Sequence, residues 1–131
     1  MTMEIGERAI RSLRFLESGD LAGMRALCSD SATVWHNDGA GERTLDEQLS
    51  RFTSLARTVD SVRFEILRQF AKANEVLQQQ VLRFERANGQ RGEVHATMYF
   101  RFTGGRIERI EEYAYEVPAD RGAAHEGDRR A

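Results

Sequence analysis

The C-terminal half of the chain alternates apolar and polar residues with a period of two, and this pattern constrains the fold more than any other feature. In its clearest run, 92–103, the apolar positions are Val94, Ala96, Met98, Phe100 and Phe102. Successive side chains of a β-strand point to opposite faces of a sheet, so such alternation predicts a strand with one buried face. Similar runs at 61–70, 76–86 and 106–117 predict four long consecutive strands.

Short turn signals between these runs predict that the strands pair antiparallel. Asn88-Gly89 and Gly104-Gly105 accept the positive φ angles that two-residue hairpin turns require. Residues 71–74 are expected to form the remaining turn.

Two of the strands carry specific expectations about which residues share a face. In the strand expected over 61–70, strict alternation places five residues on one face: Val62, Phe64, Ile66, Arg68 and Phe70. In the last strand, Ile107 and Ile110 are an odd number of residues apart, so both can be buried only if the strand is irregular. A bulge near Glu108–Arg109 would bury both and bend the strand.

The N-terminal half has helical spacing instead. Residues 4–17 place an apolar stripe on one side of a helix, and Gly19 is expected to end it. A short second helix is expected over 21–28, capped by Asp20.

A strand and a third helix complete this half. Residues 31–36 are rich in β-branched and aromatic side chains, which is typical of a strand, and a turn-rich loop follows over 37–42. Thr44 and Glu47 have the spacing of a capping box, which predicts a helix from there to about residue 58.

The predicted order, α-α-β-α-β-β-β-β, indicates an α+β fold in which three N-terminal helices pack against an antiparallel (mixed) sheet. Long, bulged strands curl, so we expect a cone-shaped curved sheet with an open mouth. Concave apolar spaces of this kind are where small molecules usually bind. We expect a single domain over 1–117 and a disordered tail over 118–131.

Composition excludes several classes of function. The formal net charge of -2 argues against a nucleic-acid binder, and the chain has no apolar stretch of membrane-spanning length. The N-terminus lacks the hydrophobic core of a signal peptide. The single cysteine, Cys28, excludes a disulfide framework and a cysteine-rich zinc site. The expected location is therefore cytoplasmic.

Three segments resemble the nuclear transport factor 2 (NTF2) superfamily: ESGDLAGMRALCSDSATVWHNDG, the capped helix after it, and MYFRFTGGRIERIEEYAYE. Within that superfamily, the sequence looks most like the SnoaL-like branch of polyketide cyclases and ketosteroid isomerases, over about residues 4–117. The resemblance implies the cone fold and homodimers that pair sheet to sheet. Members include isomerases, cyclases, dehydratases, hydrolases and non-catalytic binders, so the activity has to be argued from the site.

The resemblance to the ketosteroid isomerases extends only partly to their site. Those enzymes use a carboxylate base on the first strand, a tyrosine on the first helix and a protonated acid on a late strand. The matching positions here are His36, Ser12 and Met98. A thioether cannot donate a hydrogen bond, so a steroid isomerase mechanism is not expected.

His36 and Glu112 are the candidate catalytic residues. An imidazole accepts and donates protons near neutral pH, and His36 precedes a glycine-bearing loop. The alternative is a structural histidine that hydrogen-bonds this loop at Asn37 or Asp38. Glu112 would follow Ile110 inward if the bulge forms, and would face water otherwise.

The candidate substrate-binding residues are Ser12, Trp35, Gln80, Phe84, Met98 and Phe100. Met98 and Phe100 share a strand face and would form an apolar floor. Gln80 shares a face with Phe84 and is either a polar anchor in the pocket or an ordinary strand-edge glutamine.

Ser12 and Trp35 each allow two interpretations. Ser12 lies on the apolar seam of the first helix, so its hydroxyl either points into the pocket or bonds back to a carbonyl of its own helix. Trp35 adjoins His36 and should point the opposite way unless the strand bends; packing under a helix is the alternative to contacting a ligand.

The opposite face of the sheet is predicted to need a partner, because it carries Leu67, Val81, Tyr99, Tyr113 and Tyr115. Aromatic residues on a polar background suit a subunit interface, so a homodimer through this convex face is expected. His36, His95 and His125 lack metal-ligand spacing, and we expect neither a metal nor a cofactor.

The sequence thus predicts a small-molecule-binding protein with a cone-shaped pocket. One hypothesis is cofactor-free acid–base chemistry on a small hydrophobic substrate, such as isomerisation, cyclisation or dehydration. The other is a non-catalytic ligand-binding or accessory module, since the catalytic trio of the isomerases is missing two members. A protein adaptor is a third and weaker hypothesis.

Overall fold

A computed structural model describes residues 4–117 of the chain. Its elements are α1 (Ile5–Ser18), α2 (Leu21–Ala26), β1 (Cys28–His36), β2 (Glu42–Thr44), α3 (Leu45–Ala56), β3 (Ser61–Lys72), β4 (Glu75–Glu85), β5 (Arg91–Thr103) and β6 (Arg106–Val117). The predicted α+β class is confirmed. The predicted order lacked β2, which lies where the sequence indicated the end of a loop. The tail expected over 118–131 lies outside the described residues.

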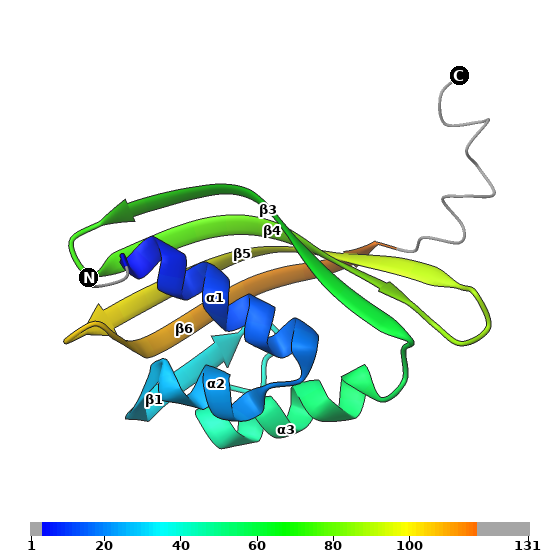
Figure 1. Cartoon of the computed structure of the whole chain (residues 1–131), viewed down its shortest axis with the longest axis horizontal. Helices are drawn as coiled ribbons and strands as arrows, with labels where there is room; N and C mark the ends of the chain where they lie inside the picture. The colour runs from blue at the N-terminus through cyan, green and yellow to red at the C-terminus, as the bar shows by residue number, and fades with distance from the viewer. Residues whose placement is uncertain (1–3, 118–131) are drawn as a thin grey trace.

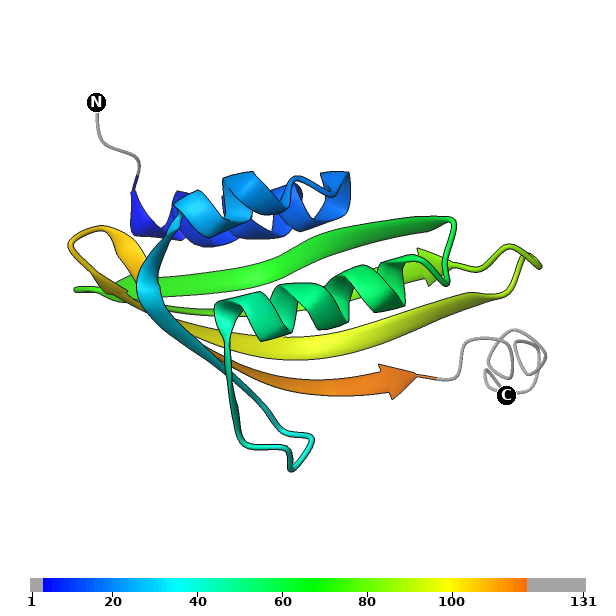
Figure 2. The same cartoon turned by 90° about the horizontal axis from the view of Figure 1, so that it is seen from below.

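The strands form a single sheet in the order β2-β1-β6-β5-β4-β3. β3 to β6 pair antiparallel along the chain, whereas β1 runs parallel to β6 and antiparallel to β2. Figures 1 and 2 show the sheet curving around the three helices, which all lie on its concave face. We call the other side of the sheet its outer face. None of the helices within residues 4–117 is long and apolar enough to cross a membrane.

The predicted signals at the helix ends are present, although α2 and α3 each end about two residues before the expected position. Gly19 has φ 75° at the end of α1, and Thr44 and Glu47 form the capping box of α3. α2 ends at Ala26 and β1 begins at Cys28, before the expected strand start at residue 31. The reason is tertiary, because Cys28 pairs with Ile107 across the parallel strands.

The predicted bulge in the last strand is present. Arg101 pairs with Arg109 and Phe102 pairs with Ile107, so Glu108 is the extra residue of β6. Ile107 and Ile110 are both buried, with exposed fractions of 0% and 4%. Because the bulge turns the side chain of Ile110 toward the core, it also determines which face of the sheet each later residue of β6 occupies.

A second bulge, in β3, corrects a prediction. Ile66 pairs with Gln80 and Arg68 pairs with Gln79, which leaves Leu67 as the extra residue. Beyond Leu67 the two faces exchange, so Phe70 is 67% exposed rather than buried beside Phe64. Ile66 and Leu67 are both apolar, so the sequence alone did not mark where the alternation breaks.

Candidate functional site

A cavity of about 240 Å³ lies between the concave face of the sheet and the helices. We call it the interior cavity. Most of its wall is apolar, with Leu13 and Leu16 from α1, Leu49 and Phe52 from α3, and Leu82 from β4. The polar and charged residues that line it are Ser12, His36, Gln48, Arg51, Gln80 and Glu112. An apolar pocket with a few polar groups is the usual form of a small-molecule site.

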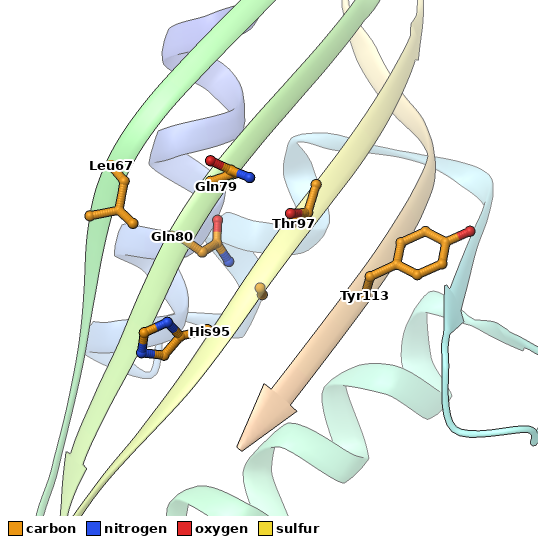
Figure 3. Close-up of a pocket in the computed structure, with 7 residues that line it drawn as sticks. Leu67, Gln79, Gln80, His95, Thr97 and Tyr113 are labelled. Carbon is orange, nitrogen blue, oxygen red and sulfur yellow. The ribbon is translucent and has the colours of Figure 1, made fainter. Parts of the chain in front are cut away.

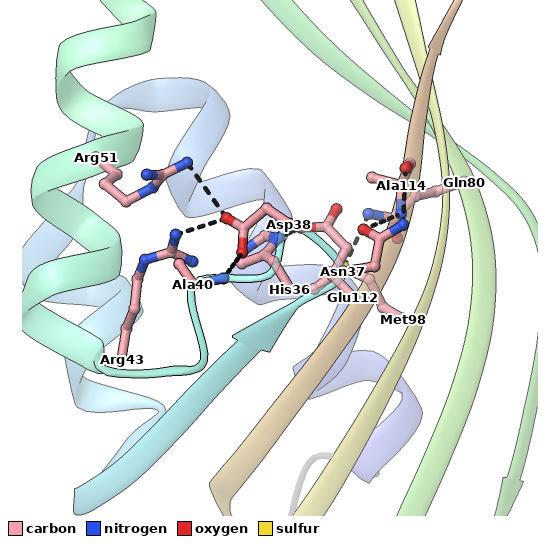
Figure 4. Close-up of polar contacts among 10 residues, drawn as sticks. All are labelled: His36, Asn37, Asp38, Ala40, Arg43, Arg51, Gln80, Met98, Glu112 and Ala114. Atoms are coloured by element: carbon pink, nitrogen blue, oxygen red, sulfur yellow. Dashed lines mark hydrogen bonds and ion pairs between the residues drawn. The ribbon is translucent and has the colours of Figure 1, made fainter.

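His36 and Glu112 meet in this cavity. They are directly paired residues of the parallel strands β1 and β6, so their side chains project from the same face. His36 Nδ1 lies 2.9 Å from Glu112 Oε1, and the two side chains are 17% and 18% exposed (Figure 4). The bulge at Glu108 makes this contact possible, because without it Glu112 would point to the outer face.

The geometry of the pair supports proton transfer. A carboxylate oxygen accepts a hydrogen bond, so contact with Glu112 selects the tautomer that carries its proton on Nδ1 of His36. In this tautomer Nε2 has a free lone pair and can accept a proton from a bound molecule.

Hydrogen bonds of the side chains of Asn37 and Asp38 hold the loop that follows His36 in place. The Asn37 side chain donates to the Ala114 carbonyl at 3.2 Å and accepts from the Ala114 N–H at 3.1 Å. Asp38 accepts from Arg43 at 2.6 Å and from the Ala40 N–H at 3.0 Å. Hydrogen bonds from these two groups lower the pKa of Asp38 from 3.8 to about 2. The imidazole of His36 is thus directed to Glu112, not to the loop.

Ser12 and Met98 both line the interior cavity. Ser12 is fully buried, and its hydroxyl donates to the Ala9 carbonyl at 2.7 Å, which is the second interpretation offered for it. Gln80, 1% exposed, lies in the middle of the sheet and donates to Met98 Sδ at 2.9 Å (Figure 4). It is therefore not a strand-edge glutamine.

Three residues predicted to bind substrate lie outside the cavity wall. Phe100 is fully buried in the core beside Phe102. Phe84 packs over Gly92 of the neighbouring strand, with the Arg86 guanidinium 4.9 Å from its ring centroid.

Trp35 is the third of these residues. Its ring centroid is 5.1 Å from that of Tyr113, with which it shares a face. His36, the next residue of β1, faces the cavity, so alternation places Trp35 on the outer face. The expectation that it packs under a helix is wrong, because the helices lie on the concave face.

Sequence reasoning missed Gln48 and Gln78. Gln48 projects from α3 into the cavity wall, and its Oε1 atom is buried without a hydrogen-bond partner among the described residues. Its position between Leu45 and Leu49, on the apolar stripe of α3, was a signal in the sequence. Gln78, 1% exposed, lies two residues before Gln80 in β4, so the alternation that indicated Gln80 was a signal for Gln78 as well.

The Cys28 thiol and the metal-ligating side chains of residues 4–117 do not form a second reactive site. Burial raises the pKa of the Cys28 thiol to about 12, so it does not act as a thiolate near neutral pH. Within residues 4–117, no three histidine, cysteine or acidic side chains are grouped so as to hold a metal ion. His125 lies beyond the described residues.

Comparisons with known proteins agree with the observed fold. The SnoaL-like domain family matches residues 9–110 of the chain. No curated protein matches it.

Several solved structures are similar in shape. IdmH of Streptomyces antibioticus, a candidate polyketide cyclase, has a TM-score of 0.74 and 15% identity over 87% of this chain and 92% of its own. An NTF2-like protein of unknown function from Burkholderia pseudomallei has a TM-score of 0.71 and 18% identity over 92% and 97%. An LEH-like epoxide hydrolase from M. tuberculosis has a TM-score of 0.65 and 19% identity over 83% and 84%. At these identities the similarity shows the fold alone.

Proposed function

We propose that this chain, which belongs to the SnoaL-like domain family within the NTF2-like superfamily, binds a small, largely apolar molecule in the interior cavity and moves a proton on it. His36 is the base and Glu112 orients it. The reaction class is cofactor-free isomerisation, cyclisation or dehydration.

One observation carries this proposal: an imidazole and a carboxylate pair at 2.9 Å inside a cavity whose wall is mostly apolar. A general base has to lie within hydrogen-bond reach of the proton it takes. An apolar wall excludes water from the site and so strengthens the electrostatic interactions of charged groups within it. Nε2 of His36 takes the proton while Glu112 stabilises the resulting positive charge.

The test starts from a thermal-shift screen of small hydrophobic carbonyl compounds, followed by an assay of turnover for each compound that binds. We expect His36→Ala to abolish turnover and Glu112→Gln to reduce it strongly, while the melting temperature stays within a few degrees. Unchanged turnover in His36→Ala would end the assignment of His36 as base.

His95 provides a matched control. Its Nε2 lies 2.9 Å from Glu93, the same separation as in the cavity pair, but its side chain is 49% exposed. His95 also pairs across the sheet with Tyr115, whose 67% exposed ring belongs to the outer face. His95→Ala is therefore expected to retain the wild-type rate.

A second candidate function is ligand binding without catalysis. It is favoured by the residues at the positions that match the tyrosine and the protonated acid of the ketosteroid isomerases. The hydroxyl of Ser12 already donates to its own helix, and Met98 has no donor. Compounds that bind in the cavity but are not converted would favour this function over the enzyme.

We also propose that the protein is a homodimer through the outer face and that it works in the cytoplasm. Support for the dimer comes from exposed apolar side chains there, including Leu67 at 48%, Tyr113 at 53% and Tyr115 at 67%. A hollow of about 290 Å³ on this face lies between Leu67, Tyr113 and His95 (Figure 3).

A cytoplasmic location fits a lone cysteine that is buried as a free thiol.

A further inference from the structure

A row of side chains crosses the concave face from one glutamine to the proposed catalytic pair. The row contains one residue from each of five neighbouring strands, and each is directly paired with the next: Gln69 of β3, Gln78 of β4, Met98 of β5, Glu112 of β6 and His36 of β1. Directly paired residues share a face of the sheet, so all five project toward the helices. The bulge at Leu67 brings Gln69 into this row, and the bulge at Glu108 brings in Glu112.

The glutamines of this region form a connected chain of hydrogen bonds, which we call the glutamine ladder: Gln69, Gln78 and Gln80. Gln69 Nε2 donates to the Gly6 carbonyl at 2.9 Å and to Gln78 Oε1 at 2.8 Å. Gln78 Nε2 then donates to Gln80 Oε1 at 2.8 Å. Gln78 and Gln80 are each 1% exposed, so water does not compete for these groups.

The direction of the ladder is determined at its α1 end. A backbone carbonyl only accepts hydrogen bonds, so Gln69 has to turn its NH₂ group to Gly6. Gln69 donates with its NH₂ group to both Gly6 and Gln78, and Gln78 in turn presents its oxygen to Gln69 and its NH₂ group to Gln80. Gly6 is needed for this approach, because a Cβ atom there would collide with the Gln69 amide. The ladder therefore ends with the NH₂ group of Gln80.

The acceptor that Gln80 meets is a poor one. Its Nε2 lies 2.9 Å from Met98 Sδ, and a thioether sulfur accepts hydrogen bonds only weakly. A buried amide donor without a strong acceptor lowers stability, so an oxygen atom offered by a ligand would be favoured there. Gln80 and Met98 line the same cavity as His36 and Glu112.

We propose that Gln80 is the carbonyl-recognition residue of the interior cavity, and that its ligands are small apolar ketones or aldehydes. The carbonyl oxygen accepts from Gln80 Nε2 in place of Met98 Sδ. This inference rests on the proposed function to the extent that a small molecule occupies the cavity, and it adds the chemical class of that molecule. It does not depend on whether His36 transfers a proton.

The test compares 1-indanone with indane, two bicyclic probes of nearly equal shape that differ by a carbonyl in place of a methylene. Dissociation constants are measured by ligand-observed NMR. Wild-type protein is expected to bind indanone roughly three- to tenfold more tightly, the range for one additional hydrogen bond. In Gln80→Leu this preference is expected to fall to about one.

Two control variants locate the effect. Gln79→Leu changes the same residue type on the same strand; Gln79 faces the opposite way and pairs with Arg68 on the outer side. It is expected to keep the wild-type preference for indanone. His36→Ala is expected to keep the preference as well, although it removes the proposed base.

A measurement on wild-type protein covers the case in which Gln80→Leu does not fold. The side-chain amide resonances of Gln80 are expected to shift on addition of indanone and to stay in place with indane. The infrared carbonyl stretch of bound indanone should lie lower than that of indanone in an apolar solvent.

The outcomes separate this inference from the proposed function. Equal affinity for the two probes, with no shift of the Gln80 amide, would overturn carbonyl recognition and leave the binding cavity standing. Failure of both probes to bind would refute small-molecule binding in the cavity, and with it both proposals. A retained preference in a His36→Ala variant without turnover supports the inference independently of catalysis.

Discussion

Two histidines of this chain pair with glutamates at the same nitrogen–oxygen distance, 2.9 Å, in different surroundings. The pair of His95 with Glu93 is about half exposed on the histidine side, and its hydrogen bond lowers the pKa of Glu93. The pair of His36 with Glu112 lies in the interior cavity. The first pair is largely open to solvent, whereas the wall of the cavity around the second is mostly apolar. At this scale, the surroundings of the pair distinguish a candidate base from a surface contact.

Asp38 carries a residue-scale prediction about pH. Its pKa is about 2 in the folded protein, against 3.8 for the free side chain, because Arg43 and the Ala40 N–H bind the charged form. A lowered folded pKa means that Asp38 stabilises the fold above about pH 4 and loses this effect as the pH falls through 2. Asp38→Asn should therefore lower the melting temperature at pH 7 and have almost no effect at pH 2. A variant equally destabilised at both pH values would contradict the assigned cause.

Gln48 carries a second prediction at the residue scale. Its Oε1 atom is buried without a hydrogen-bond partner in the described part of the chain, which costs stability. Gln48→Met keeps the size of the side chain and removes this cost, so the free energy of unfolding in urea should rise by about 1 kcal/mol. Gln78→Met is the contrasting control: it interrupts the glutamine ladder and is expected to lower the same quantity. An equal loss in both variants would argue against an unpaired Gln48.

At the scale of elements, the bulge in β3 is open to a direct test. Phe64 precedes the bulge and is 6% exposed, whereas Phe70 follows it and is 67% exposed. Phe64→Ala should cost about 3 kcal/mol of unfolding free energy, the usual result for a buried aromatic side chain. Phe70→Ala should change it by less than about 0.5 kcal/mol. Similar losses in urea unfolding would restore the strict alternation and remove the bulge.

The two bulges also connect the elements to the site. Each shifts the alternation of its strand by one residue, and the row across the concave face exists only because both shifts occur. The bulge at Glu108 brings Glu112 to His36, and the bulge at Leu67 brings Gln69 to Gln78. Bulges redirect side chains in this way near many functional sites.

At the scale of the whole molecule, the proposed homodimer yields a further prediction. Leu67→Glu and Tyr115→Glu each place a charge on the outer face and should convert the dimer to a monomer in sedimentation experiments. Leu55→Glu is the control, because Leu55 is 62% exposed on α3, on the other side of the sheet. A wild-type protein that sediments as a monomer at all concentrations would contradict the dimer.

Local patterns in the sequence determined much of this molecule. The period-two runs, the helical stripes, Gly19 and the Thr44–Glu47 capping box act through neighbouring residues, so the α+β class and the described elements other than β2 were predictable. The bulge near Glu108 was also predictable, because Ile107 and Ile110 could not both be buried without it. With that bulge, the contact between Glu112 and the cavity followed.

Only the tertiary structure decided which residues meet. The parallel pairing of β1 with β6 joins segments far apart in the chain, and it both starts β1 at Cys28 and pairs His36 with Glu112. The bulge at Leu67, the outward position of Trp35 and the core position of Phe100 depend on what packs against each face. The period-two pattern indicates that a strand has two faces, but long-range packing decides which residues are buried. A shift of one residue exchanges the buried and the exposed face.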